Sequence, residues 1–133
     1  MFLETSFLVD RLREVKRAQR GPASQKLESL KENEVMISVF TLCELRAGAE
    51  LSDHPREELE RVMQLVEPLP VIYPDSSFPV LYGEIVADLT RRGTPIPAMD
   101  LLLAVLAKRF AVPVLTRDVQ HFSKIPGLEI VTY

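Results

Sequence analysis

The chain has 133 residues, of which 47% are apolar and 26% charged, and its 19 acidic and 16 basic residues give a net charge of −3. These values are typical of one globular domain, so we expect a single domain over residues 1–133. They exclude a disordered chain and a basic protein that coats nucleic acid. The single cysteine, Cys43, cannot form an internal disulfide, and no apolar run approaches the ~20 residues of a membrane helix. We therefore expect a cytoplasmic protein.

Short apolar runs alternate along the chain with longer segments whose apolar residues recur at helical spacing. The runs predict strands at Phe2–Leu3, Val35–Phe40, Leu69–Tyr73, Val112–Leu115 and Leu128–Thr132. The periodic segments predict helices through Phe7 and Val15, from Pro22, over Thr41–Leu51, from Pro55, over Phe78–Arg92 and after Pro97. Strands separated by helices favour parallel neighbours joined by right-handed crossovers. The sequence thus predicts an α/β sandwich with helices on both faces, whose ligand site lies beyond the carboxyl ends of the strands.

Four acidic residues lie at the expected carboxyl ends of the strands. Glu4 follows the first strand and Asp118 follows the fourth, while Glu44 and Asp100 lie in the first turns of two helices. Carboxylates that converge at one edge repel one another unless cations neutralise them. Because oxygen ligands without a Cys or His cluster suit Mg²⁺ or Mn²⁺ rather than Zn²⁺, the pattern indicates a magnesium or manganese site.

Each acid also has a purely structural explanation. Thr41 and Glu44 have the spacing of a capping box, Asp100 could complement a helix dipole, and Asp118 could cap the short turn that follows it. Glu4 could be an ordinary acid at a strand end. Only their joint placement at one edge favours a shared site.

Four segments, taken in order, resemble the motifs of the PIN-domain ribonucleases, specifically the VapC-type toxins of toxin–antitoxin pairs. They are residues 4–10 (Glu-Thr-Ser-Phe-Leu-Val-Asp), 37–49, 93–104 and 115–128. The resemblance implies a PIN-like sandwich with a central, mostly parallel sheet of four to five strands. It also implies an Mg/Mn-dependent endoribonuclease, the toxin of a type II toxin–antitoxin system, that hydrolyses RNA phosphodiesters by metal-activated water.

The resemblance further assigns roles and partners. Glu4, Glu44, Asp100 and Asp118 would hold Mg²⁺ or Mn²⁺, and the hydroxyls of Ser6 and Thr116 would orient ligands or water. The implied partners are an RNA substrate, a VapB-like antitoxin that fills a groove between helices, and a second copy of the chain in a homodimer. Apolar surface for these contacts is expected at Leu27 and Leu30 or on the 59–66 segment.

The first acid departs from the family pattern, which has aspartate where this chain has Glu4. The additional methylene moves the carboxylate by about 1.5 Å. This favours, as an alternative, a catalytically weakened interaction protein that binds antitoxin or RNA. A phosphatase of the haloacid-dehalogenase type is disfavoured, because residues 4–6 lack the Asp-x-Asp nucleophile motif.

Other polar residues near these motifs are expected at the surface. They include Asp10 and His121, which the sequence alone does not tie to the acids. The basic residues Arg11, Arg13, Lys16, Arg17 and Arg20 form either a solvated helix face or a patch that contacts phosphate.

Overall fold

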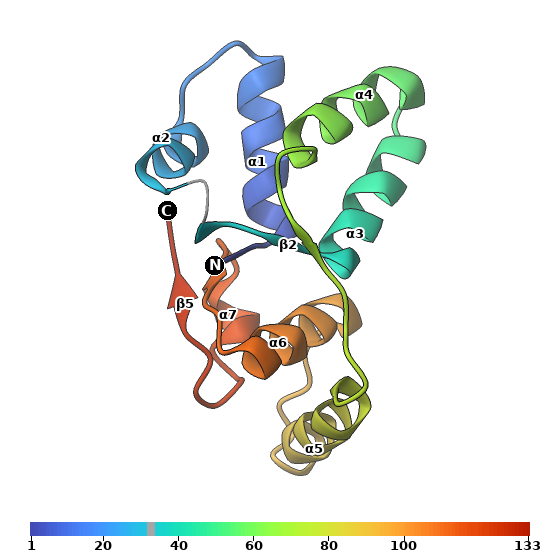
Figure 1. The fold of residues 1–133 in the computed structure, drawn as a ribbon, viewed down its shortest axis with the longest axis vertical. Coiled ribbons are helices and arrows are strands. Elements are labelled where there is room, and N and C mark those ends of the chain that lie inside the picture. Colours follow the sequence, from blue (N-terminus) through green and yellow to red (C-terminus); the bar gives the residue numbers. More distant parts are fainter. Residues whose placement is uncertain (32–33) are drawn as a thin grey trace.

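The computed structural model describes residues 1–31 and 34–133, in which seven helices surround five short strands (Figure 1). In chain order these are β1 (Phe2–Leu3), α1 (Thr5–Lys16), α2 (Pro22–Ser29), β2 (Ile37–Ser38), α3 (Val39–Glu50), α4 (Pro55–Val66), β3 (Val71–Ile72), α5 (Phe78–Arg91), α6 (Ala98–Phe110), β4 (Val114–Leu115), α7 (Val119–Phe122) and β5 (Ile130–Val131). No helix within the described residues has the length and apolar character needed to span a membrane.

All strand pairs are parallel, as expected. β1 pairs with β4 and β4 with β5, while β2 pairs with β3. An isolated bridge between Phe2 and Met36 joins the two ladders, so the strands follow the order β3-β2-β1-β4-β5. The predicted α/β class is therefore confirmed. Each strand spans only two residues: β1 has the predicted bounds, and the other four strands are shorter than the apolar runs that predicted them.

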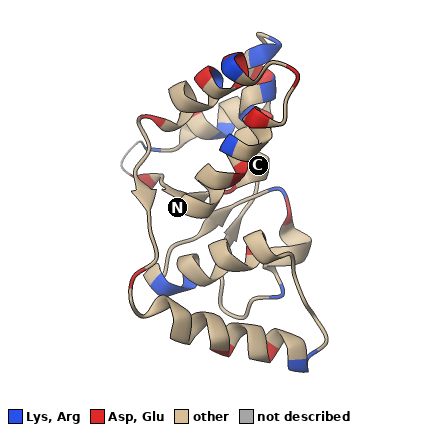
Figure 2. Cartoon of the chain, turned by 90° about the vertical axis from the view of Figure 1, so that its right-hand side faces the viewer, with Lys and Arg blue, Asp and Glu red and all other residues tan. Residues whose placement is uncertain are grey.

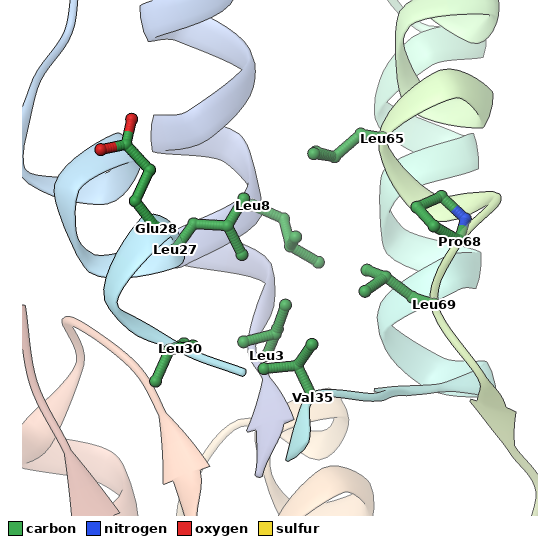
Figure 3. Close-up of a pocket in the computed structure, with 9 residues that line it drawn as sticks. All are labelled: Leu3, Leu8, Leu27, Glu28, Leu30, Val35, Leu65, Pro68 and Leu69. Carbon is green, nitrogen blue, oxygen red and sulfur yellow. The ribbon is translucent and has the colours of Figure 1, made fainter. Parts of the chain in front are cut away.

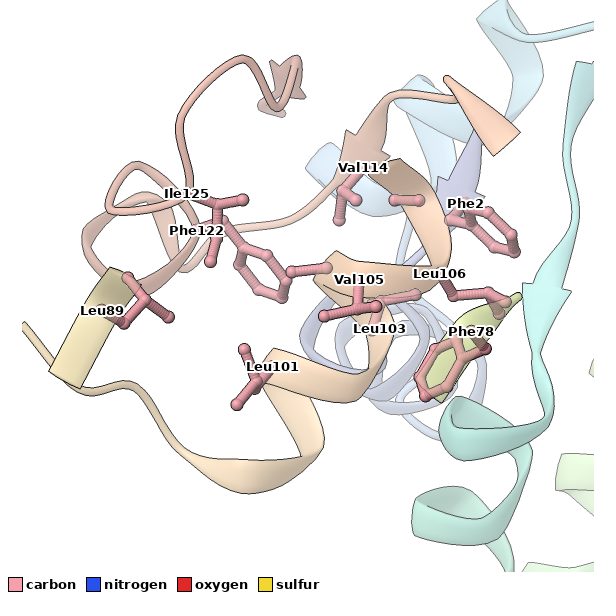
Figure 4. Close-up of a cluster of buried hydrophobic side chains, with 12 residues drawn as sticks. Phe2, Phe78, Leu89, Leu101, Leu103, Val105, Leu106, Val114, Phe122 and Ile125 are labelled. Atoms are coloured by element: carbon pink, nitrogen blue, oxygen red, sulfur yellow. The ribbon is translucent and has the colours of Figure 1, made fainter. Parts of the chain in front are cut away.

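The sheet separates two hydrophobic clusters, because successive strand residues point to opposite faces. Phe2 and Val114 belong to the cluster that receives α5, α6 and α7 (Figure 4). Leu3 and Leu115 belong to the other, which receives α1 to α4. All four side chains are fully buried. Helices therefore cover both faces, and the sheet edge between them is the one that carries the acids.

The second strand ends earlier than the apolar run 35–40 suggests. The Oγ of Ser38 accepts a hydrogen bond from the backbone N–H of Thr41 at 2.9 Å, so Ser38 is the N-cap and α3 begins at Val39. The structural alternative for Glu44, a capping box with Thr41, is therefore wrong. Glu44 lies in the second turn of α3, and its carboxylate has no capping role there.

A carboxylate from α1 caps the next helix. Glu14 accepts hydrogen bonds from the backbone N–H groups of Ala23 (3.0 Å) and Ser24 (2.8 Å) at the start of α2. Gly21 makes room for this contact, since a Cβ at that position would lie 2.8 Å from Cδ of Glu14. Burial opposes ionisation of Glu14, but the hydrogen bonds from Ser24, Ala23 and Gly21 outweigh it and lower the pKa of Glu14 below 4.5.

We expect Glu14→Ala to lower the free energy of unfolding by about 1 kcal/mol at neutral pH, the scale of a lost cap. A carboxyl whose pKa is lowered by folding stabilises the fold above its unfolded value of 4.5 and loses that effect as the pH falls through the folded pKa. In urea unfolding, the difference in free energy of unfolding between parent and variant should therefore be smaller well below pH 4.5 than at neutral pH. The control is Glu84→Ala, at an exposed position within α5. An equal cost for both variants would contradict the capping role.

Candidate metal centre

Glu4 lies where β1 ends and α1 begins. Its backbone N–H donates to the carbonyl of Leu115 at 3.0 Å, which aligns the carboxyl ends of β1 and β4. The Oε2 of Glu4 accepts hydrogen bonds from the backbone N–H of Ser6 and from Oγ1 of Thr116, each at 2.9 Å, and also from the Ser6 hydroxyl. Glu4 is only 6% exposed. All of these bonds reach one oxygen; in the described part of the chain, Oε1 accepts none.

The hydroxyls of Ser6 and Thr116 also hold the loop after β4. Oγ of Ser6 accepts from the backbone N–H of Arg117 at 3.2 Å, and Oγ1 of Thr116 accepts from the N–H of Asp118 at 2.9 Å. The two hydroxyls thereby connect Glu4 to the loop that carries Asp118. These contacts fix the orientation of the Glu4 carboxylate.

Asp100 and Asp118 come together beside a histidine. Nδ1 of His121 lies 2.9 Å from Oδ2 of Asp100 and 2.6 Å from Oδ2 of Asp118. One ligand atom from each of the three side chains lies within 4.8 Å of the others. Asp100 comes from the first turn of α6, whereas Asp118 is the N-cap of α7, its Oδ1 accepting from the N–H of His121 at 3.3 Å.

Glu44 faces the same charges from α3. Its Oε2 accepts a hydrogen bond from the hydroxyl of Thr5, the residue after Glu4. Burial raises the pKa of Glu44; the Thr5 bond opposes this rise, and the charges of Glu4 and Asp100 add to it. Burial is also the largest cause that raises the pKa of Asp100, and the negative charges of Glu4 and Asp118 add to this rise. The hydrogen bond and charge of His121 oppose it. Each carboxylate therefore lies within the electrostatic reach of others, which makes the cluster receptive to a cation.

Three residues, Glu44, His121 and Asp10, are placed differently from what the sequence predicts. Glu44 reaches the cluster from the second turn of α3 rather than the first. His121, expected at the surface, is about two-thirds buried and touches two acids. The spacing of three residues between His121 and Asp118 at a helix start was the one sequence feature that could have predicted this position. The contact with Asp100, 21 residues away in the chain, forms only in the fold.

Asp10 also differs from a simple surface residue. It accepts hydrogen bonds from Arg117 (2.8 and 3.1 Å), Arg13 (3.2 Å) and the hydroxyl of Tyr133 (2.8 Å). Burial and the Asp10 carboxylate raise the pKa of Tyr133, which keeps its phenol protonated as a donor. Asp10 thus holds Arg117 in the segment between Thr116 and Asp118.

Comparison with known proteins identifies the family of the chain. The sequence profile of the PIN domain family matches residues 1–128. The tRNA(fMet)-specific endonuclease VapC of Salmonella typhimurium is 34% identical over 102 residues, which cover 77% of this chain and 77% of that protein. The endonuclease of the same name from Shigella flexneri is 30% identical over 100 residues, or 75% of this chain and 76% of that protein.

Solved structures share the whole architecture. DNA-bound VapBC from Salmonella typhimurium contains a chain with a TM-score of 0.88 and 28% identity, over 98% of this chain and 96% of that one. VapBC2 from Rickettsia felis, bound to a DNA fragment from its promoter, contains a chain with a TM-score of 0.89 and 24% identity, over 99% of this chain and 97% of that one. The chain therefore belongs to the PIN domain family. Within that family its relatives are VapC proteins.

Proposed function

We propose that the protein is a divalent-metal-dependent endoribonuclease that acts as the toxin of a type II toxin–antitoxin system in the cytoplasm. The observation that carries the proposal is the cluster of Asp100, Asp118 and His121, whose ligand atoms lie within 4.8 Å of one another, with the charges of Glu4 and Glu44 close enough to act on this cluster. The relatives named VapC, two of which are tRNA(fMet)-specific endonucleases, support RNA as the substrate. The solved VapBC complexes support an antitoxin as the partner.

The donor set fits Mg²⁺ or Mn²⁺, which favour carboxylate oxygens. Glu4, Glu44, Asp100 and Asp118 would hold the ion, which supplies charge neutralisation and activation of water toward a phosphodiester when bound. Ser6 and Thr116 fix the orientation of Glu4 through Oε2. Burial raises the pKa of both Glu44 and Asp100, and the charges of neighbouring carboxylates add to the rise, which supports a bound cation at this site.

The test is cleavage of a tRNA pool and of unrelated RNAs by the purified chain in Mg²⁺ and in Mn²⁺. We expect cleavage that stops when a chelator is added and returns when the ion is restored in excess. The resemblance implies products with a 5′-phosphate and a 3′-hydroxyl. Cleavage that persists in the chelator would contradict metal dependence.

Charged residues near the cluster support contact with RNA phosphates. Figure 2 shows that charged residues gather on the α1–α4 half of the molecule, whereas α5 and α6 are largely uncharged. Arg13, Arg17 and Arg117 line a cavity of about 420 Å³ beside Asp10 and Tyr133. Much of the basic segment shows the other expected behaviour, that of a solvated helix face, since Arg13, Lys16 and Arg20 form ion pairs with Asp10, Glu58 and Glu28. Only part of the segment is therefore available for phosphate contact.

An apolar groove supports binding of an antitoxin segment. A cavity of about 320 Å³ lies between α1, α2 and the end of α4, lined by Leu8, Leu27, Leu30, Leu65 and Leu69 among others (Figure 3). An amphipathic segment could place apolar side chains there. The 59–66 segment is less available than expected, because Val62 and Val66 are buried in the chain's own core. The homodimer stays a prediction.

A second candidate function is the weakened interaction protein, which Glu4 favours. It would bind antitoxin or RNA through the same surfaces without cleaving RNA. The two functions differ in the response to Glu4→Asp, which should speed RNA cleavage by a nuclease and leave an interaction protein without cleavage.

A further inference from the structure

His121 occupies a position between two carboxylates of the candidate metal centre. Its Nδ1 is within 3 Å of both Asp100 and Asp118, although the two acids come from different elements. In the neutral tautomer that carries its proton on Nε2, Nδ1 presents its lone pair toward these two carboxylates. The nitrogen is thus placed where it could bind an ion held by the two acids.

The position of His121 is fixed by packing on the other side of α7. Phe122, the next residue, is fully buried and points into the cluster that contains Leu101 and Val105 of α6 (Figure 4). Asp100 immediately precedes Leu101, so the packing of α7 on α6 in this cluster helps to position both His121 and Asp100. Such support from rigid elements is what a preorganised site needs.

A nitrogen donor changes which ions a carboxylate site prefers. Carboxylates suit Mg²⁺ and Mn²⁺, whereas imidazole suits later first-row ions, whose affinity for such ligands rises from Mn²⁺ through Co²⁺. Mg²⁺ gains little from imidazole because it favours oxygen ligands. A site with His121 among its ligands should therefore discriminate against Mg²⁺ more strongly than a site built from carboxylates alone.

We propose that His121 is a metal ligand, through Nδ1, of the ion held by Asp100 and Asp118, and that it shifts the selectivity of the site from Mg²⁺ toward Mn²⁺ and Co²⁺. The inference deepens the proposed function, since it rests on a divalent ion at this site. It concerns binding and does not require that RNA be cleaved.

The test compares the parent with His121→Asn and with a control, His54→Asn, at the chain's only other histidine, an exposed residue at the start of α4. Calorimetry measures the affinities for Co²⁺ and Mg²⁺ without RNA. Electron spin-echo spectroscopy of bound Mn²⁺ detects a coordinated imidazole nitrogen. We expect His121→Asn to reduce the ratio of Co²⁺ to Mg²⁺ affinity about tenfold or more and to remove the nitrogen signal. The control should retain both.

His121→Asp is the second variant, and it keeps the test decisive if the asparagine variant folds poorly. It replaces nitrogen by oxygen, so we expect tighter Mg²⁺ binding and no nitrogen signal. A parent without a nitrogen signal would overturn the proposal. So would equal losses of Co²⁺ and Mg²⁺ affinity in His121→Asn, since these would mean that His121 only positions the two acids. A parent that binds none of the three ions would instead overturn the metal-dependent function itself.

Discussion

Asp100→Asn is expected to reduce the rate of RNA cleavage by at least about a hundredfold in Mg²⁺ or Mn²⁺. The change keeps the size of the side chain and removes one of the charges that would hold the ion. Loss of a group that merely orients a metal ligand typically costs 10–100-fold, so loss of a ligand should cost at least as much. A cleavage assay at saturating metal, with ion affinity measured in parallel, checks this prediction.

The same variant should not lose stability, which separates a functional effect from misfolding. Burial and the Glu4 charge raise the pKa of Asp100, so the ionised carboxyl is less favourable in the folded chain than in the unfolded one. Above that pKa its charge opposes folding, and a neutral amide removes the penalty. In a chelator, Asp100→Asn should therefore unfold at the same temperature as the parent or a higher one.

The matched control is Asp88→Asn on α5. Asp88 pairs with Arg92 at 2.7 Å, and both side chains are substantially exposed. Exposed pairs of this kind contribute ~0–1 kcal/mol, so the control should cleave at the parental rate with nearly parental stability. Equal loss of activity in the two variants, or full activity of Asp100→Asn, would argue against the assigned centre.

The helices were more predictable from the sequence than the strands. Pro22 and Pro55 begin α2 and α4 as expected, and α5 ends just before Gly93, which adopts the positive φ of 64° that favours glycine. Strand lengths were overestimated because apolar residues continue past the last paired residue. In β2, Ser38 accepts a hydrogen bond from the backbone N–H of Thr41 and caps α3, which ends the strand while the apolar pattern continues.

The candidate site was also predictable only in part, because some of its residues are positioned by local sequence and others by distant contacts. Glu4 follows β1 directly and Asp118 lies three residues after the end of β4, so the parallel topology alone places them at one edge. Asp10 and His121 gain their roles from contacts with residues 107 and 21 positions away, Arg117 and Asp100. Such contacts leave no periodic signal, so they became visible only when the fold brought these segments together.

Glu4→Asp is expected to accelerate RNA cleavage in Mg²⁺ and to narrow the difference between Mg²⁺ and Mn²⁺. Glu4 is held by Ser6 and Thr116 through Oε2, so its longer side chain must fit between a fixed helix start and the ion. Aspartate is a preferred N-cap residue, which should let the shorter side chain keep the bond to the N–H of Ser6. The methylene displaces the carboxylate by about 1.5 Å, and a misplacement near 1 Å can cost on the order of a hundredfold in rate.

The choice of ion makes this prediction specific. Mg²⁺ demands near-ideal octahedral geometry, so a displaced ligand should impair the parent more in Mg²⁺ than in Mn²⁺. Glu44→Asp is the matched control, because it makes the same shortening at an acid whose glutamate agrees with the family motif. It should slow cleavage, whereas Glu4→Asp should speed it. A parent that cleaves as fast as Glu4→Asp in Mg²⁺ would refute the geometric argument. If neither form cleaves RNA while both bind Mn²⁺, the protein is the interaction protein rather than the nuclease.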